Sequence, residues 1–197
     1  MTRAVFYPRY LLVVLTILVA FLPSKAERLP VKIYTSADGL GSGFVDYVMR
    51  DSRGFIWACT RDGLSRFDGS RFVNYQIGEK NAPPGIENIY ESRSGNYFIT
   101  TTGGTYRFDP NSVSATDTAI PRLNAEKVLD WRGQFAEDGA GNLWLISTNL
   151  YRVVEADGKV DFQKVEWEIP PQSSSFVVYE VEDAPDGSIW VYTSWGV

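Results

Sequence analysis

The stretch that decides the fold is residues 51–68, which read DSRGFIWACTRDGLSRFD. Polar turn residues lead to Gly54, a large aromatic follows at Trp57, and a second turn carries Gly63. The stretch closes on Arg-Phe-Asp at residues 66–68. Gly and Asp accept the backbone conformations of tight turns, so the stretch predicts short strands separated by reversals of the chain.

The strand predicted at residues 55–60 alternates between two faces that are both largely apolar. A strand that is apolar on both faces is usually buried on both faces. Further short strands are predicted on either side, at residues 45–49, 64–67 and 71–75. Together these segments predict a four-stranded antiparallel meander.

The same pattern recurs along the chain, with a glycine three residues before a large aromatic in every copy. The aromatics stand at positions 57, 98, 144 and 190, so the copies are 41, 46 and 46 residues apart. The third copy has a weaker ending, and the repeat positions are Gly54, Trp57, Gly63, Arg66, Phe67, Gly95, Phe98, Gly104, Arg107, Phe108, Gly141, Trp144, Gly187, Trp190 and Gly196.

Four-stranded sheets that are buried on both faces and recur at this interval must stack face to face. Radial stacking predicts an all-β fold, a β-propeller, which typically has 4–8 blades. The alternative is a β-sandwich in which the spacing of the turns arises by chance. The expected blades are residues 45–77, 86–121, 131–167 and 177–197, and residues 31–35 are expected to be an outer strand that closes the last blade.

The fourth copy stops after its second strand, so the sequence holds about three and a half blades and predicts an incomplete ring. We therefore expect the amino-terminal part of a longer product, whose further blades and output domain would be partners of this region. A protein of this length in its own right is the alternative.

The amino terminus predicts export. Arg3 and Arg9 precede an apolar run at residues 11–22, and Ser24 and Ala26 are small residues at positions −3 and −1 of a cleavage site. These features predict a signal peptide at residues 1–26, cut after Ala26, ahead of a mature domain at 27–197. An uncleaved anchor is the alternative. We expect a periplasmic or other extracytoplasmic location in a bacterial cell.

The composition removes several kinds of chemistry. The 197 residues include no His and one Cys, with 19 Lys and Arg against 24 Asp and Glu, a formal net charge of −5. This excludes an imidazole base, a histidine metal ligand and an intrachain disulfide. Net negative charge also argues against nucleic acid as a partner. We expect no catalytic residue, no metal and no cofactor in this chain.

The first copy resembles the two-component regulator propeller repeat. The resemblance rests on the DGL opening at 38–40, the Asp-x-x-Gly-x-aliphatic-Trp centre at 51–57 and the Gly-Leu-x-Arg-Phe ending at 63–67. Departures are Phe98 for the central Trp, Leu150 for a turn glycine, and a long polar link at 109–126.

The resemblance implies the sensor region of a membrane-bound bacterial regulator. In that family, a further β-domain, a transmembrane helix and a cytoplasmic kinase, diguanylate cyclase or DNA-binding output commonly follow the propeller. It also implies a homodimer of the full-length protein and a ligand, for which an oligosaccharide is one candidate.

Two tryptophans have no counterpart in the other copies, Trp131 and Trp167. They are candidate sugar-stacking or partner-binding residues, with ordinary packing as the alternative. The repeated arginines 66 and 107 are interpreted as bridges to a carboxylate or covers for an aromatic ring. The recurring acids Asp51, Asp62, Asp68 and Asp138 are interpreted as caps of their own turns, with a glycosidase-like pair left open. Cys59 is expected in the core.

The residues and the resemblance together predict a ligand-sensing or interaction module without catalysis. Two alternatives stay open at this point, an exported propeller enzyme or binding protein that acts on polysaccharide, and an assembly scaffold that has no small ligand.

Overall fold

The computed structural model describes residues 30–77, 85–114, 120–156, 158–166 and 177–194. The chain divides into two compact units, Met1–Ile33 and Tyr34–Val197, and every described strand belongs to the second. The predicted signal peptide with its cleavage site, Trp167 and Gly196 lie outside the described residues.

The described residues form fourteen strands and one short 3-10 helix, η1 (Ser36–Asp38). The first blade holds β1 (Val45–Arg50), β2 (Ile56–Thr60), β3 (Gly63–Phe67) and β4 (Phe72–Ile77); the second holds β5 (Ile86–Glu91), β6 (Tyr97–Thr101), β7 (Gly104–Ser114) and β8 (Arg122–Leu129); the third holds β9 (Gln134–Glu137), β10 (Leu143–Ile146), β11 (Leu150–Ala156) and β12 (Lys159–Val165); the fourth holds β13 (Val178–Asp183) and β14 (Ile189–Thr193).

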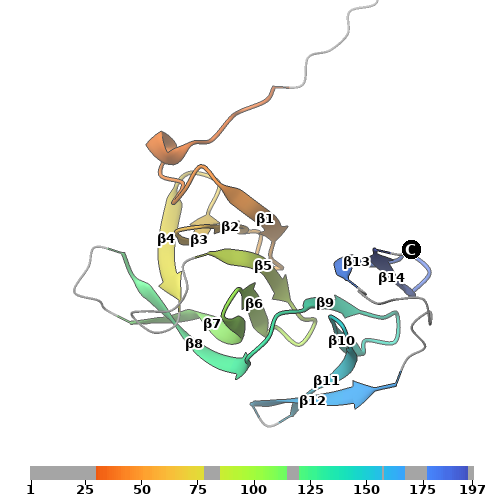
Figure 1. Ribbon diagram of the computed structural model, residues 1–197. Helices are drawn as coiled ribbons and strands as arrows, with labels where there is room; N and C mark the ends of the chain where they lie inside the picture. The colour runs from red at the N-terminus through yellow and green to blue at the C-terminus, as the bar shows by residue number, and fades with distance from the viewer. Residues whose placement is uncertain (1–29, 78–84, 115–119, 157, 167–176, 195–197) are drawn as a thin grey trace, which may run out of the picture. The chain divides into compact units, whose positions relative to one another are not determined.

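Within each blade, neighbouring strands pair antiparallel in chain order, as the repeat predicts. The sheets are β1-β2-β3-β4, β8-β7-β6-β5, β12-β11-β10-β9 and β13-β14 (Figure 1). A short parallel pairing, Gln76 with Arg122 and Ile77 with Leu123, joins the outer strands of the first two blades into one eight-stranded sheet. The all-β, partial propeller fold is confirmed.

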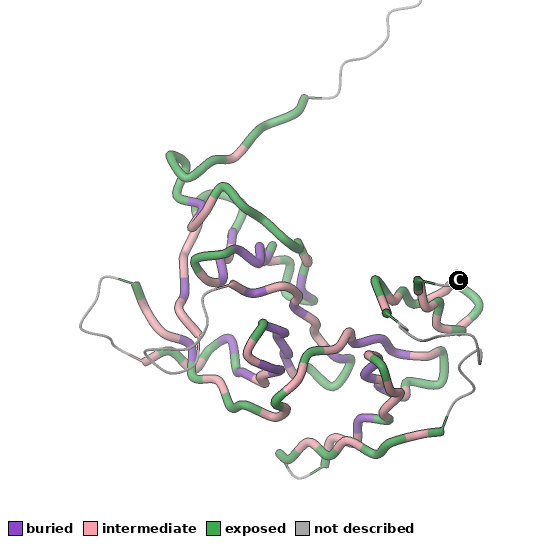
Figure 2. The backbone as a smooth tube through the Cα atoms, in the orientation of Figure 1, coloured by how far each residue is buried: buried purple, intermediate pink, exposed green. Residues whose placement is uncertain are grey.

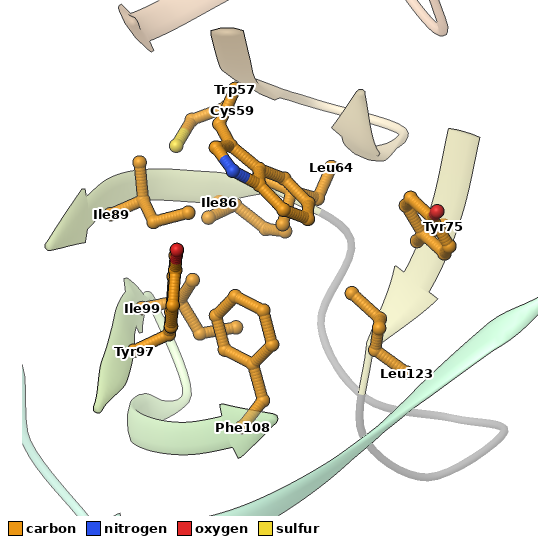
Figure 3. Packing of buried hydrophobic residues seen from close by; sticks show 10 residues of the cluster. All are labelled: Trp57, Cys59, Leu64, Tyr75, Ile86, Ile89, Tyr97, Ile99, Phe108 and Leu123. Atoms are coloured by element: carbon orange, nitrogen blue, oxygen red, sulfur yellow. The ribbon is translucent and has the colours of Figure 1, made fainter. Parts of the chain in front are cut away.

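The blades pack through their central aromatics. Trp57 is fully buried, with its ring centroid 6.2 Å from that of Tyr97 and 6.0 Å from that of Phe108 in the second blade (Figure 3). Phe98 of the second blade stacks in turn on Phe135 of the third, at 4.5 Å. We call the face that carries the central aromatic the front face of a blade, and the opposite face its back face.

Burial follows this stacking. Buried residues gather on the middle strands of the first three blades, such as β2, β3, β6 and β10, whereas β1 and the described residues of β13 and β14 include none (Figure 2). The expected burial of both faces of β2 holds for Trp57, Ala58, Cys59 and Thr60. Ile56, on the back face, is 40% exposed, because no described blade packs against that part of the sheet.

Two segments differ from the expected organisation. The outer strand of the second blade is β8, which lies wholly beyond the expected limit at residue 121, and β7 continues to Ser114. Much of the predicted polar link is therefore strand. The composition did not predict β8 as a strand, because polar residues alternate with Leu123 and Ala125 and the strand buries only one face.

Residues 31–35 belong to no described strand, and the two outer strands of the blade that they are expected to close are not among the described elements. Tyr34 instead packs against the first blade, with its ring centroid 5.0 Å from that of Phe67 and 5.6 Å from that of Phe72. Closure of the last blade by residues 31–35 stays a prediction.

Candidate ligand-binding site

A cavity of about 690 Å³ opens where one end of the second, third and fourth blades meets. Its wall comes from the start of β5, the end of β6, the link between β8 and β9, the turn between β10 and β11, and the start of β13. In an antiparallel meander the first strand begins at the same end of the sheet at which the second strand stops. The lining segments of the three blades therefore come together at that end.

Trp131 borders this cavity, and the sequence had singled it out. Its ring packs on Tyr151 with centroids 4.8 Å apart and planes 34° from parallel. The backbone carbonyl of Trp131 accepts a hydrogen bond from the Thr105 hydroxyl at 2.9 Å. Trp131 is half-buried, and it packs against the buried cluster that holds Phe98 and Phe135 while it also lines the cavity.

The link that carries Trp131 lies flush against the end of β10 because position 133 is glycine. A Cβ atom at Gly133 would stand 2.8 Å from Cδ1 of Leu145 and 2.9 Å from the carbonyl oxygen of Ile146. No side chain fits into that space without movement of the backbone. Gly133 thus sets how closely the link, and with it Trp131, approaches the third blade.

Polar groups complete the wall. Arg132 donates from Nη1 to Oε1 of Glu87 at 2.6 Å, which ties the link to the second blade. Oε1 of Gln134 accepts from the backbone N–H of Val181 at 3.1 Å, which ties it to the fourth. Asn149, at the turn between β10 and β11, also lines the cavity. An aromatic face beside amide and charged groups suits a polar ligand with apolar surfaces.

A second cavity of about 610 Å³ follows the inner strands β1, β5, β9 and β13. Glu87, Asn88, Gln134 and Tyr179 line both cavities, so the two lie next to each other. Its lining includes acidic residues from three strands, Asp46, Glu87, Glu180, Glu182 and Asp183.

These acids influence the tyrosines of the inner strands. Burial raises the pKa of Tyr47, and the nearby Glu180 raises it further. Burial likewise raises the pKa of Tyr90, with Asp183 as the next contribution. Both phenols therefore stay protonated at neutral pH and can donate hydrogen bonds.

The other predicted residues serve the blades rather than the cavity. Asp51 and Asp138 accept hydrogen bonds from the backbone of their own turns and from the central tryptophan. Asp68 caps its turn in the same way, accepting from Ser70 and Arg71. The structure thus gives these three acids the turn-capping contacts that the sequence suggested.

The two repeated arginines have different environments. The Arg66 guanidinium lies 4.6 Å from the ring centroid of Phe55 and 5.5 Å from that of Tyr75. Arg107 instead forms an ion pair with Glu126 at 2.8 Å. The register explains this difference, because Arg107 lies opposite Glu126 in the next strand, whereas Arg66 lies opposite Val73.

Several lining residues were missed by the sequence analysis, among them Gln134, Asn149 and Tyr179. The available signal was a departure from the repeat. The third copy replaces the second turn glycine with Asn149-Leu150-Tyr151, and two of these three residues line the cavity.

No protein-family model and no curated protein matches the sequence. Solved structures do match. The extracellular domain of BT3049, described as a hybrid two-component system of B. thetaiotaomicron, is 18% identical at a TM-score of 0.56, over 81% of this chain and 23% of that one. The extracellular domain of BT4673, described as a one-component system of the same organism, is 20% identical at a TM-score of 0.54, over 85% and 25%.

An inactive variant of virginiamycin B lyase from Staphylococcus aureus, with quinupristin, is 14% identical at a TM-score of 0.50, over 75% of this chain and 48% of that one. These proteins share a fold. The likeness therefore supports the propeller architecture, and the chain spans about a quarter of the two regulator domains and about half of the lyase.

The described residues contain no cluster of three or more His, Cys, Asp or Glu side chains suited to a metal ion. In the same part of the chain, no helix has the length and apolar character needed to cross a bilayer.

Proposed function

We propose that this chain is the ligand-binding part of an extracytoplasmic sensor and that the cavity beside Trp131 takes an oligosaccharide. The observation that carries the proposal is the half-buried indole of Trp131 at the border of a 690 Å³ cavity with amide groups in its wall. Cavities of roughly 300–1,000 Å³ are the usual size for small ligands.

The chemistry of the wall favours a carbohydrate over a purely apolar ligand. A sugar ring presents C–H groups on its faces, which pack on an aromatic ring, and hydroxyls at its edge. Asn149 supplies an amide group on the wall and the Arg132–Glu87 pair supplies charged donors and acceptors, whereas the Gln134 amide is engaged with the backbone of Tyr179 and Val181.

Sensing is favoured over catalysis by the fold neighbours, because two of them are extracellular domains of regulators. The third is an enzyme, but its matched structure is an inactive histidine-to-alanine variant, and this chain has no histidine. A propeller can carry either activity, so the fold alone does not choose. We propose a longer regulator, dimeric and exported through residues 1–26, whose output follows this region.

Calorimetric titration with a panel of neutral oligosaccharides tests the proposal. We expect one of them to bind, Trp131→Ala to weaken that binding by about tenfold or more, and Trp131→Phe to retain most of it, because a ring remains. Phe44→Ala is the matched control, since Phe44 is a 56% exposed aromatic that does not line the cavity.

Two results would contradict the proposal. Unchanged affinity in Trp131→Ala would remove the cavity as the ligand site, and the absence of binding across the panel would remove the carbohydrate. Assaying the same mixtures for new reducing ends separates a sensor from an enzyme, because only an enzyme cleaves the glycan.

A further inference from the structure

The inner strands of three blades carry the same irregularity at the same place. In β1, β5 and β13 one extra residue interrupts the pairing with the next strand, and these residues are Asp46, Glu87 and Tyr179. Each of them is the second residue of its strand. An extra residue of this kind, a β-bulge, bends the strand and redirects side chains, and bulges are frequent next to functional sites. Three bulges in the strands that border one cavity therefore point to a role in binding.

A polar side chain occupies one equivalent position on the inner strand of all four blades. This position lies opposite the residue that stands two places after the central aromatic. In β1, β5 and β13 it follows the bulge, and β9 begins with it. All four side chains line the 610 Å³ cavity. We call them the polar quartet, which consists of Tyr47, Asn88, Gln134 and Glu180.

The bulges explain why neighbouring residues of one strand share a cavity wall. In a regular strand, consecutive side chains point to opposite faces. Here Asp46 and Tyr47 both line the second cavity, and Glu87 and Asn88 line both cavities. The extra residue accounts for this, because a bulge changes the direction of the side chains beside it.

Gln134 positions a neighbouring member of the quartet. Its Oε1 accepts a hydrogen bond from the backbone N–H of Val181 at 3.1 Å, and its Nε2 donates to the backbone carbonyl of Tyr179. These two backbone groups flank Glu180 in the sequence. The Gln134 amide thus holds the bulge of the fourth blade against the third blade, and we regard Gln134 as a positioning residue.

Tyr47 and Asn88 have polar groups left for a ligand. Neither side chain forms a hydrogen bond with another described residue. Burial, and after it the nearby Glu180, raises the pKa of the Tyr47 phenol, so the hydroxyl stays protonated at neutral pH and can donate. The Asn88 amide can both donate and accept. Together the two side chains can satisfy the hydroxyls of a sugar unit.

The charges of the wall favour an uncharged ligand. Two of the three bulge residues are acidic, Asp46 and Glu87. Arg132 is the one basic residue among the described residues that line either cavity, and it pairs with Glu87 at 2.6 Å. A ligand carboxylate would therefore meet acidic groups with no unpaired base to receive it, and like charges placed together weaken binding.

We propose that the binding site continues from Trp131 into the second cavity, where Tyr47 and Asn88 hydrogen-bond a further unit of an uncharged oligosaccharide. The inference rests on the proposed function and adds the length and charge of the ligand. Each cavity alone lies within the roughly 300–1,000 Å³ that is usual for a small ligand. A ligand that fills both is therefore longer than one that fills the cavity beside Trp131 only.

Calorimetric titration of the full chain with gluco-, manno- and galacto-oligosaccharides, from single sugars to oligomers of several units, tests this. We expect affinity to rise with length until both cavities are filled. Tyr47→Phe removes only the phenol oxygen and should weaken the longest ligand by about threefold to tenfold, with no change for the shortest ligand that binds. Trp131→Ala should weaken both. Tyr106→Phe is the matched control, because Tyr106 lines neither cavity.

The corresponding uronate oligomers test the charge of the ligand. We expect them to bind about tenfold or more weakly than the neutral oligomers at low salt, because the acidic wall repels them. Asp46→Asn should narrow this difference. Glu166→Gln is the matched control and should leave it unchanged, because Glu166 is exposed and lines neither cavity.

The outcomes separate this inference from the proposed function. Binding that depends on Trp131 but not on ligand length, or an unchanged affinity of Tyr47→Phe for the longest ligand, would overturn the continuation and leave the proposed function intact. Uronates that bind as tightly as neutral oligomers would overturn the charge selectivity. The absence of binding across the whole panel would overturn both. Unchanged binding of the shortest ligand by Tyr47→Phe also shows that this variant is folded.

Discussion

The indole Nε1 of Trp57 donates a hydrogen bond to Oδ2 of Asp51 at 2.9 Å, inside the interface between the first two blades. The third blade repeats this pair, with Trp144 donating to Asp138 at 3.0 Å. The second blade has Phe98, which has no N–H, and the residue six positions before it is Ser92 rather than an acid. The fourth blade has Trp190 with Ala184 six positions before it, so the acid–indole pair belongs to the first and third of the four described blades.

This pairing predicts strong coupling between the two positions of the first blade. Asp51→Ser should cost about 1–3 kcal/mol, because it leaves the buried indole N–H without its acceptor. Trp57→Phe should also destabilise by loss of buried volume. The double variant, which recreates the Ser and Phe of the second blade, should cost less than the sum of the two. Urea unfolding of all four proteins measures this, and strict additivity would contradict the coupling.

The turn between β2 and β3 requires a glycine for two reasons, its positive φ and the close approach of a neighbouring strand. Gly63 has a φ of +134°, and a Cβ atom there would stand 2.4 Å from the carbonyl oxygen of Tyr75. We expect Gly63→Ala to cost roughly 2–5 kcal/mol, the sum of left-handed strain and overpacking. Gly69→Ala is the matched control, with a φ of +96° and open space around it, and should cost about 1–2 kcal/mol in the same unfolding experiment.

Acid should destabilise the third blade through Asp138. The Asn142 side-chain amide, together with the Trp144 indole and backbone N–H groups, lowers the pKa of Asp138 to about 2 against the opposing effect of burial. Its ordinary value is 3.8. Because the folded value is the lower one, the stabilisation is present above pH 3.8 and is lost as the pH falls towards 2.

Melting temperatures measured between pH 5 and pH 2 check this expectation. Asp138→Asn should lower the melting temperature at pH 5 and make its fall with acid shallower than in the unchanged protein. Some acid dependence should remain, because hydrogen bonds also lower the pKa of Asp68 and Asp186. An equally steep fall in Asp138→Asn would show that this carboxylate does not contribute.

The Cys59 thiol should not react with thiol reagents in the folded protein. Its side chain lies in the core between the first two blades, and burial raises the pKa of its thiol. Thiolate is the reactive form, and both burial and the raised pKa suppress it. A coloured disulfide reagent should therefore react only after denaturant is added. Stoichiometric reaction without denaturant, in protein whose circular dichroism is native, would contradict this.

Much of the architecture could be predicted because the repeat encodes it locally. Turn residues, a glycine and a central aromatic at fixed spacing are sufficient to predict a meander, and burial of both strand faces predicts stacking. The β8 strand was the exception, since it buries only one face and alternates polar with apolar residues. Residues 31–35 resemble an outer strand in sequence, but strand formation needs a partner edge, which the local sequence does not specify.

The candidate site was predictable in only one residue. Trp131 was identified because it departs from the repeat. The departure at Asn149-Leu150-Tyr151 was also visible in the sequence, but it was not interpreted as part of a cavity wall. Gln134 and Tyr179 carry no local signal, because they come from different blades and meet only when those blades stack.

The sequence by itself determined the blade, because turn propensity, strand alternation and the spacing of the aromatics are local properties. Only the tertiary structure decided what each repeated residue contacts. Arg66 and Arg107 occupy equivalent positions, yet one lies over aromatic rings and the other pairs with Glu126, since the partner strand supplies Val73 in one blade and a carboxylate in the other. The cavity wall, the charges at the blade interfaces and the ion pairs are formed by residues that lie far apart in the sequence. These residues come into contact only when the strands pair and the blades stack.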